Sequence, residues 1–547
     1  MSQLETTLQA EGLLTAAQVD DARQLAQASG RSLVEVLIKE GFVDERVVLE
    51  HLASDSGIAF VVLRDMQIPE AAVRVVSAKL AAHYAIMPVR FEQGVLTVAT
   101  AEPFNLSAVN DLQTRLGYHV ERVLACRADI HQALRRYYGV GADTVERILA
   151  ETPARAEETP LNTAETAHDL ERMAEDVSVV RLVNQIFQEA IQDRATDIHF
   201  EVYRDEMILR RRIDGILYDM QIPRNIRLLY PAIVSRVKLM AGLNIVERRL
   251  PQDGRSRVKI GAREYDLRVS VVPAMHGEDI VIRILPSTMG FALEQIGFSD
   301  VHLTALRELI AKPHGIIFAT GPTGSGKSTT LYACLTRLNT RERKIITIED
   351  PVEYEVKGVT QTQIRPEIGL TFSRALRSML RHDPDVMMVG EVRDRETAEI
   401  AIQTAMTGHL VLSTLHTNDA AGGAVRLIDM GIDPYLITST VLAFLAQRLV
   451  RIICPSCRES YMEDNQRLYR GHGCPKCGQT GYHGRMAIGE FLPLTPEIQQ
   501  LILQKSSAKD IRIRANELGM TTLAADGLEK VLKGLTTAEE VLRVTSL

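Results

Sequence analysis

The chain has no tryptophan, no excess of basic residues and no long apolar run. No segment approaches the roughly 20 consecutive apolar residues that a membrane-spanning helix requires. The first residues, 1–5, lack the basic start and apolar stretch of a signal peptide. Its 63 basic and 70 acidic side chains give a net charge of −7, whereas nucleic-acid-binding proteins usually carry a basic excess. These absences predict a cytoplasmic protein, or one that is peripheral on a membrane, and argue against a nucleic-acid partner.

Cysteine is also scarce, with six residues in 547, but four of them form two tight pairs. The first pair is Cys454 and Cys457, and the second is Cys474 and Cys477. Two such pairs let four thiolates surround one Zn²⁺ tetrahedrally, so that every ligand position is filled. The sequence therefore predicts a closed, structural zinc site in a reducing compartment, with a redox role for either pair as the alternative.

The N-terminal part of the chain divides into three segments by pattern. In residues 1–57, leucines four apart followed by glycine occur twice, at Leu4, Leu8 and Gly12 and again at Leu33, Leu37 and Gly41. Such leucines share a helix face and the glycine ends the helix, so this segment is predicted to form two helical hairpins. Residues 58–140 are predicted to form a small α/β domain. Residues 141–176 hold ten acidic and three basic residues, which is typical of a flexible acidic linker.

The remaining chain predicts a multidomain α/β protein. Residues 177–288 combine a helical stretch with alternating strands, which indicates an α+β domain. Residues 289–450 alternate strands with helices, which predicts a parallel sheet with crossover helices. The cysteine pairs define a zinc subdomain over 451–485, and a helical region is expected over 486–547.

A phosphate-binding loop lies between a short apolar strand, 315–320, and a helix predicted from Thr329 to Leu338. This strand–loop–helix context is what the P-loop motif requires. Its glycines let backbone N–H groups turn toward a phosphate at a helix N-terminus. Lys327 is expected to reach the β- and γ-phosphates and Ser328 to bind Mg²⁺. The predicted ATP-binding residues are Gly321, Pro322, Thr323, Gly324, Ser325, Gly326, Lys327, Ser328 and Thr329.

Carboxylates and histidines follow the later strands. The strand 345–348 ends in Glu349-Asp350-Pro351-Val352-Glu353, and carboxylates at this end of a strand lie where open α/β sheets bind ligands. The strand 386–389 ends in Gly390-Glu391, where a Walker B strand usually ends in Asp. His409 and His416 flank a third strand. Taken singly, each histidine is more often a core or surface residue than a catalytic one.

Together these four motifs resemble the secretion ATPases that power type II secretion, type IV pilus assembly and related machines. The Gly321–Thr329 loop is similar to the family's Walker A motif, 349–353 to its Asp box, 389–391 to its atypical Walker B and 407–418 to its His box. The resemblance implies a RecA-like ATPase core with a preceding PAS-like domain. It also implies an ATP- and Mg²⁺-dependent homohexamer at the inner membrane, bound to the platform and cytoplasmic-domain proteins of its machine.

The resemblance implies roles for individual residues. Glu353 would be the general base, and Glu391 would act with Mg²⁺ and its waters. His409 and His416 would sense the γ-phosphate, and Arg268 and Arg283 would reach the nucleotide in closed subunits. From composition alone, each arginine is more often a surface or salt-bridge residue.

Within the family, the resemblance favours type II secretion over pilus assembly, because the tail at 526–545 is slightly more similar to that of the type II secretion members. Retraction motors of the family lack the cysteine cluster, which argues against that function. Some relatives bind a cyclic dinucleotide through repeats like 1–57, but this chain lacks their Arg-Leu-Gly opening, so docking to a membrane partner is the preferred role. A nucleic-acid motor and a scaffold that binds ATP without turnover are the alternatives from other classes.

Overall fold

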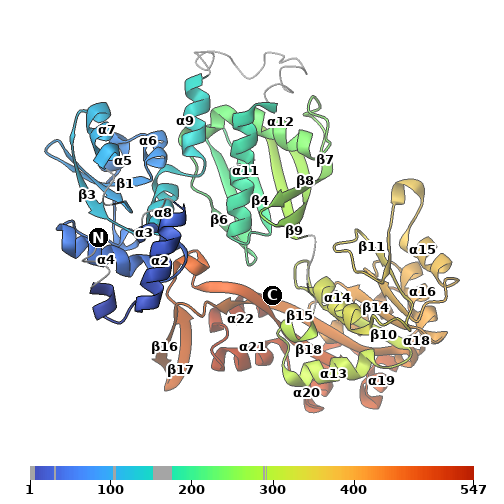
Figure 1. Ribbon diagram of the computed structural model, residues 1–547. Coiled ribbons are helices and arrows are strands. Elements are labelled where there is room, and N and C mark those ends of the chain that lie inside the picture. The colour runs from blue at the N-terminus through green and yellow to red at the C-terminus, as the bar shows by residue number, and fades with distance from the viewer. Residues whose placement is uncertain are drawn as a thin grey trace. The chain divides into compact units, whose positions relative to one another are not determined.

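The computed structural model describes residues 7–29, 33–102, 106–151, 175–286, 290 and 292–546 (Figure 1). The chain forms two compact units. The first comprises Met1–Ile213, Leu217–Arg257 and Leu267–Ile284, and the second comprises Asp214–Ile216, Val258–Asp266 and Leu285–Leu547. Within the described residues, no helix combines the length and the apolar character needed to cross a bilayer.

The first unit begins with short helices, as the repeat predicts: α2 (Ala16–Ser29), α3 (Leu33–Lys39) and α4 (Glu45–Ser56). Gly12 and Gly41 both have φ of 74°, a left-handed conformation that ends a helix and that glycine adopts without strain. Asp44 caps α4 by accepting a hydrogen bond from the N–H of Arg46. The helical-hairpin prediction is thus confirmed for the described part of residues 1–57.

A three-stranded sheet follows in the order β1-β2-β3, in which β1 and β2 are antiparallel and β2 and β3 are parallel. This arrangement agrees with the predicted small α/β domain. Its elements are η1 (Leu63–Asp65), α5 (Glu70–Val75), α6 (Ala78–His83), β1 (Ile86–Glu92), β2 (Val95–Thr100), α7 (Leu106–Leu116), β3 (His119–Leu124) and α8 (Arg127–Tyr138).

Helix α9 (Ala142–Glu151) occupies the start of the predicted linker, 141–176. Its Val145 and Ile148 are buried, and the carboxylate of Glu146 accepts hydrogen bonds from the N–H groups of Ala78 and Lys79 at the start of α6. Although this segment is rich in acidic residues, Val145 and Ile148 have the i, i+3 spacing of an apolar helix face. The linker prediction needs correction over 142–151, and its part from 152 to 174 lies outside the described residues.

The rest of the first unit is an antiparallel sheet in the order β6-β5-β4-β9-β8-β7, with α11 and α12 against one face (Figure 1). Alternating burial along β4 and β8 reflects a sheet with one covered face. The elements are α11 (Val177–Gln192), β4 (Asp197–Val202), β5 (Met207–Ile213), β6 (Ile216–Asp219), η2 (Arg224–Leu229), α12 (Tyr230–Met240), β7 (Gln252–Ile260), β8 (Arg263–Ala274) and β9 (Gly277–Pro286).

The second unit is built on a seven-stranded sheet in the order β12-β11-β13-β14-β10-β15-β18. All neighbouring strands are parallel except β15 and β18. Strands β10, β11, β13 and β14 are buried along their whole length, because helices cover both faces. The predicted parallel sheet is confirmed.

The helices and strands of this unit up to the cysteine pairs are η3 (Leu293–Gln295), α13 (Asp300–Ile310), β10 (Gly315–Thr320), α14 (Lys327–Leu338), β11 (Ile345–Glu349), β12 (Thr360–Gln363), η4 (Pro366–Ile368), α15 (Phe372–Met379), β13 (Val386–Val389), α16 (Arg395–Met406), β14 (Leu410–Leu415), α17 (Ala420–Asp429), α18 (Pro434–Thr440) and β15 (Val441–Ile453). The later ones are β16 (Arg458–Glu463), β17 (Gln466–Gly471), η5 (Pro475–Cys477), β18 (Tyr482–Pro493), α19 (Pro496–Leu503), α20 (Ala508–Glu517), α21 (Leu523–Leu532) and α22 (Ala538–Thr545).

The boundaries predicted at 450 and 485 fall inside strands. β15 continues to Ile453, β18 begins at Tyr482, and the two pair from Ala443–Pro493 to Ile453–Tyr482. The cysteine pairs are thus an insertion between two neighbouring strands of the seven-stranded sheet. The C-terminal helices α21 and α22 pack back against β18 and β15, so the predicted zinc and C-terminal regions share one compact unit with 289–450.

Candidate functional site

The P-loop joins the end of β10 to the start of α14. A Cβ atom at Gly321 would lie 2.6 Å from Ser325 Oγ and 2.7 Å from the carbonyl oxygen of Gln447. Gly326 has φ of 90°, and its Cβ would lie 2.7 Å from Gln447 Nε2. The loop can therefore adopt this path only with glycine at both positions. The side chains at Thr323, Ser328 and Thr329 remain exposed around the helix N-terminus, where an anion is stabilised.

Lys327 is the first residue of α14 and is buried. Its Nζ donates hydrogen bonds to the carbonyl oxygens of Gly321 (2.7 Å) and Pro322 (3.0 Å). Burial, aided by the charge of Arg448 and opposed by Glu391, lowers the pKa of Lys327 to about 8. An anion in the loop would favour the charged form of the amine, so this loop is suited to binding a phosphate.

Two residues of β15, Gln447 and Arg448, support the P-loop from behind. Thr330 of α14 donates a hydrogen bond to Gln447 Oε1 at 2.7 Å. Arg448 is 4 % exposed and donates to the carbonyl oxygens of Gln447 (3.1 Å) and Asn418 (2.9 Å). The sequence analysis missed both residues, although two polar side chains in the middle of the apolar run 441–453 were a visible signal.

The Asp box and the atypical Walker B motif follow neighbouring strands, β11 and β13. The N–H of Gly390 donates to the carbonyl oxygen of Ile348 at 2.8 Å. A Cβ at position 390 would lie 3.2 Å from that oxygen and 3.3 Å from the Cα of Glu349. There is thus little room for the usual Asp at the end of β13, and the first carboxylate after this strand is that of Glu391, one residue later.

Glu391 lies at the carboxyl end of the sheet beside His416. Its side chain is 13 % exposed, and it pairs with Arg393 at 2.7 Å and His416 at 3.5 Å. Burial and the nearby charge of Lys327 lower the pKa of His416, while Glu391 acts in the opposite direction. His416 is therefore neutral at pH 7 in the absence of an added anion.

His409 lies at the opposite edge of the sheet from His416. It precedes β14, which runs parallel to β10 with Leu410 beside Gly315 and Leu415 beside Thr320. The P-loop follows Thr320, so β14 separates His409 from it. His409 Nδ1 lies 3.0 Å from the carbonyl oxygen of Thr404. The structure brings Lys327, Glu391 and His416 to one edge of the sheet, and His409 lies away from them.

Arg268 and Arg283 belong to the first unit, on the neighbouring strands β8 and β9. Arg283 is 53 % exposed and its Nε donates to Asp197 at 3.1 Å. Asp197 is buried and also lies 3.8 Å from Arg212. Asp197 thus lies between two arginines and holds the side chain of Arg283.

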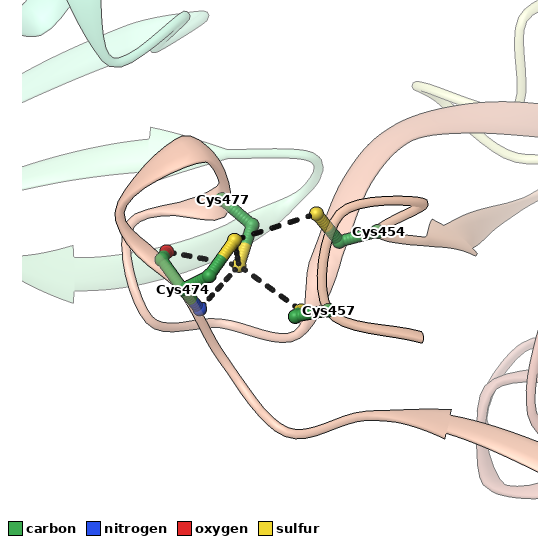
Figure 2. Close-up of side chains that lie close together, drawn as sticks. All are labelled: Cys454, Cys457, Cys474 and Cys477. Atoms are coloured by element: carbon green, nitrogen blue, oxygen red, sulfur yellow. Dashed lines mark hydrogen bonds between the residues drawn. The ribbon is translucent and has the colours of Figure 1, made fainter. Parts of the chain in front are cut away.

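The four paired cysteines converge between the ends of β15 and β18, with their sulfur atoms facing one another (Figure 2). The Sγ–Sγ distances are 3.8 Å for Cys454–Cys474, 3.9 Å for Cys457–Cys477 and 3.7 Å for Cys474–Cys477. Tetrahedral Zn²⁺ with Zn–S bonds of about 2.3 Å requires sulfur atoms about 3.8 Å apart. The N–H groups of Cys474 and Gly481 donate to Cys477 Sγ, and such bonds stabilise a thiolate. The donor set therefore fits a zinc ion.

Comparisons with known proteins agree with this geometry. The family model "Type II/IV secretion system protein" matches residues 172–543, and the MshEN domain model matches residues 56–144. The type IV pilus assembly ATPase PilB of Myxococcus xanthus is 40% identical, with 98% of this chain and 97% of the relative covered. The type II secretion system protein E of Xanthomonas campestris is 42% identical, with coverage of 96% and 95%. The type II secretion system ATPase E of Vibrio cholerae is 42% identical, with coverage of 81% and 91%.

Among solved structures, the ATPase DotB of Legionella pneumophila covers 66% of this chain and 95% of its own, with a TM-score of 0.50 and 22% identity. This likeness supports the fold alone. Together with the family match, it confirms the predicted multidomain α/β fold with a P-loop ATPase core.

Proposed function

Because the chain belongs to the family of type II/IV secretion system proteins, we propose that it is the ATPase motor of a type II secretion system. Hydrolysis of ATP would drive assembly of a pseudopilus and export of proteins. The observation that carries this proposal is the convergence of the P-loop, Glu391 and His416 at one edge of the parallel sheet. A relative named for type II secretion also covers nearly the whole chain.

The residues at this edge divide the work of hydrolysis. Lys327 would bind the β- and γ-phosphates, and Ser328 would bind Mg²⁺, which neutralises charge on the phosphates when bound. Glu353 would accept the proton of the attacking water as general base. Glu391 and His416 would hold the metal-bound waters and detect the γ-phosphate.

The assembly is proposed to be a homohexamer on the cytoplasmic side of the inner membrane, bound to platform and cytoplasmic-domain proteins. Arg268 and Arg283 would supply positive charge to the nucleotide in the assembled ring. The cysteine cluster would hold one structural Zn²⁺. The N-terminal helices are assigned to docking rather than to a cyclic dinucleotide.

Assembly of type IV pili is the alternative function. It is favoured by the match to the Myxococcus PilB, which covers both chains almost completely. The two functions share the ATPase chemistry, so the active site does not distinguish them.

A Lys327→Ala variant in the source cell separates the two machines. Loss of secreted proteins with pili retained supports type II secretion. Loss of pili with secretion intact supports the alternative, and no change in either refutes the motor assignment.

The general base is tested on the purified full-length protein with Glu353→Gln. We expect ATP affinity to be retained and kcat to fall by about 10²–10⁴-fold. Glu355→Gln is the matched control, because Glu355 lies on the same loop and is exposed. Unchanged turnover in Glu353→Gln would remove Glu353 from the mechanism.

A further inference from the structure

The Asp box contains a second carboxylate, that of Glu349, which is directed into the protein. Glu349 ends β11 and is 3 % exposed. Its Oε1 accepts hydrogen bonds from Thr347 Oγ1 and from Gln361 Nε2, the latter at 3.1 Å. Its Oε2 accepts a hydrogen bond from the hydroxyl of Tyr332. A buried carboxylate with three donors, from α14, β11 and β12, is a satisfied anchor and not a group exposed to substrate.

Two of these donors also hold the loop that carries Glu353. The Tyr332 hydroxyl accepts a hydrogen bond from the backbone N–H of Glu353 at 3.3 Å. Gln361 Nε2 donates to the carbonyl oxygen of Tyr354 at 2.9 Å, and Gln361 Oε1 accepts from the N–H of Val356 at 2.7 Å. The backbone from 353 to 356 is thus tied at three points to side chains that themselves bind Glu349.

Tyr332 also connects this loop to the P-loop. It lies on α14, five residues after Lys327, and its ring is completely buried. Burial, together with the Glu349 carboxylate, raises the pKa of Tyr332, so the hydroxyl keeps the proton that it donates. The same helix therefore begins at the phosphate-binding lysine and positions the segment that bears the proposed base.

We propose that Glu349, Tyr332 and Gln361 are positioning residues that fix Glu353 relative to the P-loop during ATP hydrolysis. The inference rests on the proposed role of Glu353. None of the three side chains needs to touch ATP. Glu349 orients the side chains of Tyr332 and Gln361, and these two side chains hold the backbone of the loop. Because a general base must lie within hydrogen-bond reach of its water, a small shift of this loop lowers the rate of the chemical step more than it lowers ATP binding.

The first test is Tyr332→Phe in the full-length protein, which removes one oxygen atom and keeps the ring. We expect kcat to fall by about tenfold to a hundredfold while KM for ATP and the affinity for a fluorescent ADP analogue change less than about twofold. Amide hydrogen exchange should become faster at 353–356. Tyr138→Phe is the control, because the hydroxyl of the half-buried Tyr138 also has two hydrogen-bond partners, the carbonyl oxygens of Val73 and Val76, in the separate α/β domain. Its kcat should stay at the wild-type value.

A double-mutant cycle with Glu353→Gln distinguishes positioning from general stability. If Tyr332 acts through Glu353, Tyr332→Phe will lower the residual rate of Glu353→Gln by less than about twofold. A full additional loss in that background would overturn the inference while leaving Glu353 as the base. If Glu353→Gln itself has wild-type turnover, the proposed base and the inference fail together.

Gln361→Met provides a second variant if Tyr332→Phe folds poorly. It removes the amide but keeps a side chain of similar length, and it should also lower kcat without raising KM. Wild-type kcat in both variants, with normal exchange at 353–356, would refute the positioning role.

Discussion

A buried carboxylate, that of Glu540, helps to attach the C-terminal helix α22 to the ATPase sheet, and its neutralisation should loosen that helix. Glu540 is 2 % exposed. It accepts hydrogen bonds from Arg451 Nη2 at 2.7 Å and from Arg543 Nη2 at 2.8 Å. The Arg451 guanidinium also lies over the ring of Tyr482, 4.0 Å from its centroid. This cluster fixes α22 to β15 just before the first cysteine pair.

The free energy that the Glu540 carboxylate contributes to this attachment follows from its pKa. Burial by itself would raise it, but hydrogen bonds from Arg543 and Arg451 lower the pKa from 4.5 to about 2. At about 1.4 kcal/mol per pKa unit, this difference corresponds to about 3 kcal/mol. The value is an upper bound, because Arg543 is 40 % exposed and its charge is screened by water. The stabilisation is complete above pH 4.5 and is lost as the pH falls toward 2.

The perturbation is Glu540→Gln, and the assay is amide hydrogen exchange of α22 at pH 7, which reports local opening rather than unfolding of the whole chain. We expect exchange to be faster by up to roughly a hundredfold. Glu517→Gln is the control, because Glu517 and its partner Arg514 are 57 % and 44 % exposed. It should change stability by less than about 1 kcal/mol. Unchanged protection of α22 in Glu540→Gln would refute the ion-pair reasoning.

Two further perturbations test the metal cluster and the Walker B strand. Cys454→Ser should lower the zinc content measured by elemental analysis from about one ion per chain to near zero, and equal zinc in variant and wild type would exclude the cluster as the site. Gly390→Ala should destabilise the ATPase unit by about 1–3 kcal/mol through crowding against Ile348 and should lower kcat, since β11 leads into Glu353. A variant with wild-type thermal stability and turnover would show that the close approach at Gly390 has no consequence.

Part of the molecule follows directly from its sequence. The P-loop could be located because its strand, glycines, Lys327 and helix are contiguous, and neighbours in the chain must be neighbours in space. The two cysteine pairs are equally local, since each CxxC presents two sulfur atoms together whatever the rest of the fold does. The helical hairpins at the N-terminus were visible for the same reason, in leucines and glycines a few residues apart.

The tertiary structure decided everything that depends on strand order and on contacts between distant segments. The acidic segment after residue 141 begins as a helix because α6 and α11 cover its apolar face. The composition of the segment does not predict contacts with these two helices. His409 and His416 flank one strand and therefore lie at its opposite ends, and the parallel pairing of β13 with β14 brings only His416 close to Glu391. The support of the P-loop by Gln447 requires the pairing of β15 with β10, which are far apart in the chain. The support of Glu353 by Tyr332 requires helix α14 to lie beside the end of β11. Local spacing determines which groups are available, whereas the order of the strands determines which of them meet.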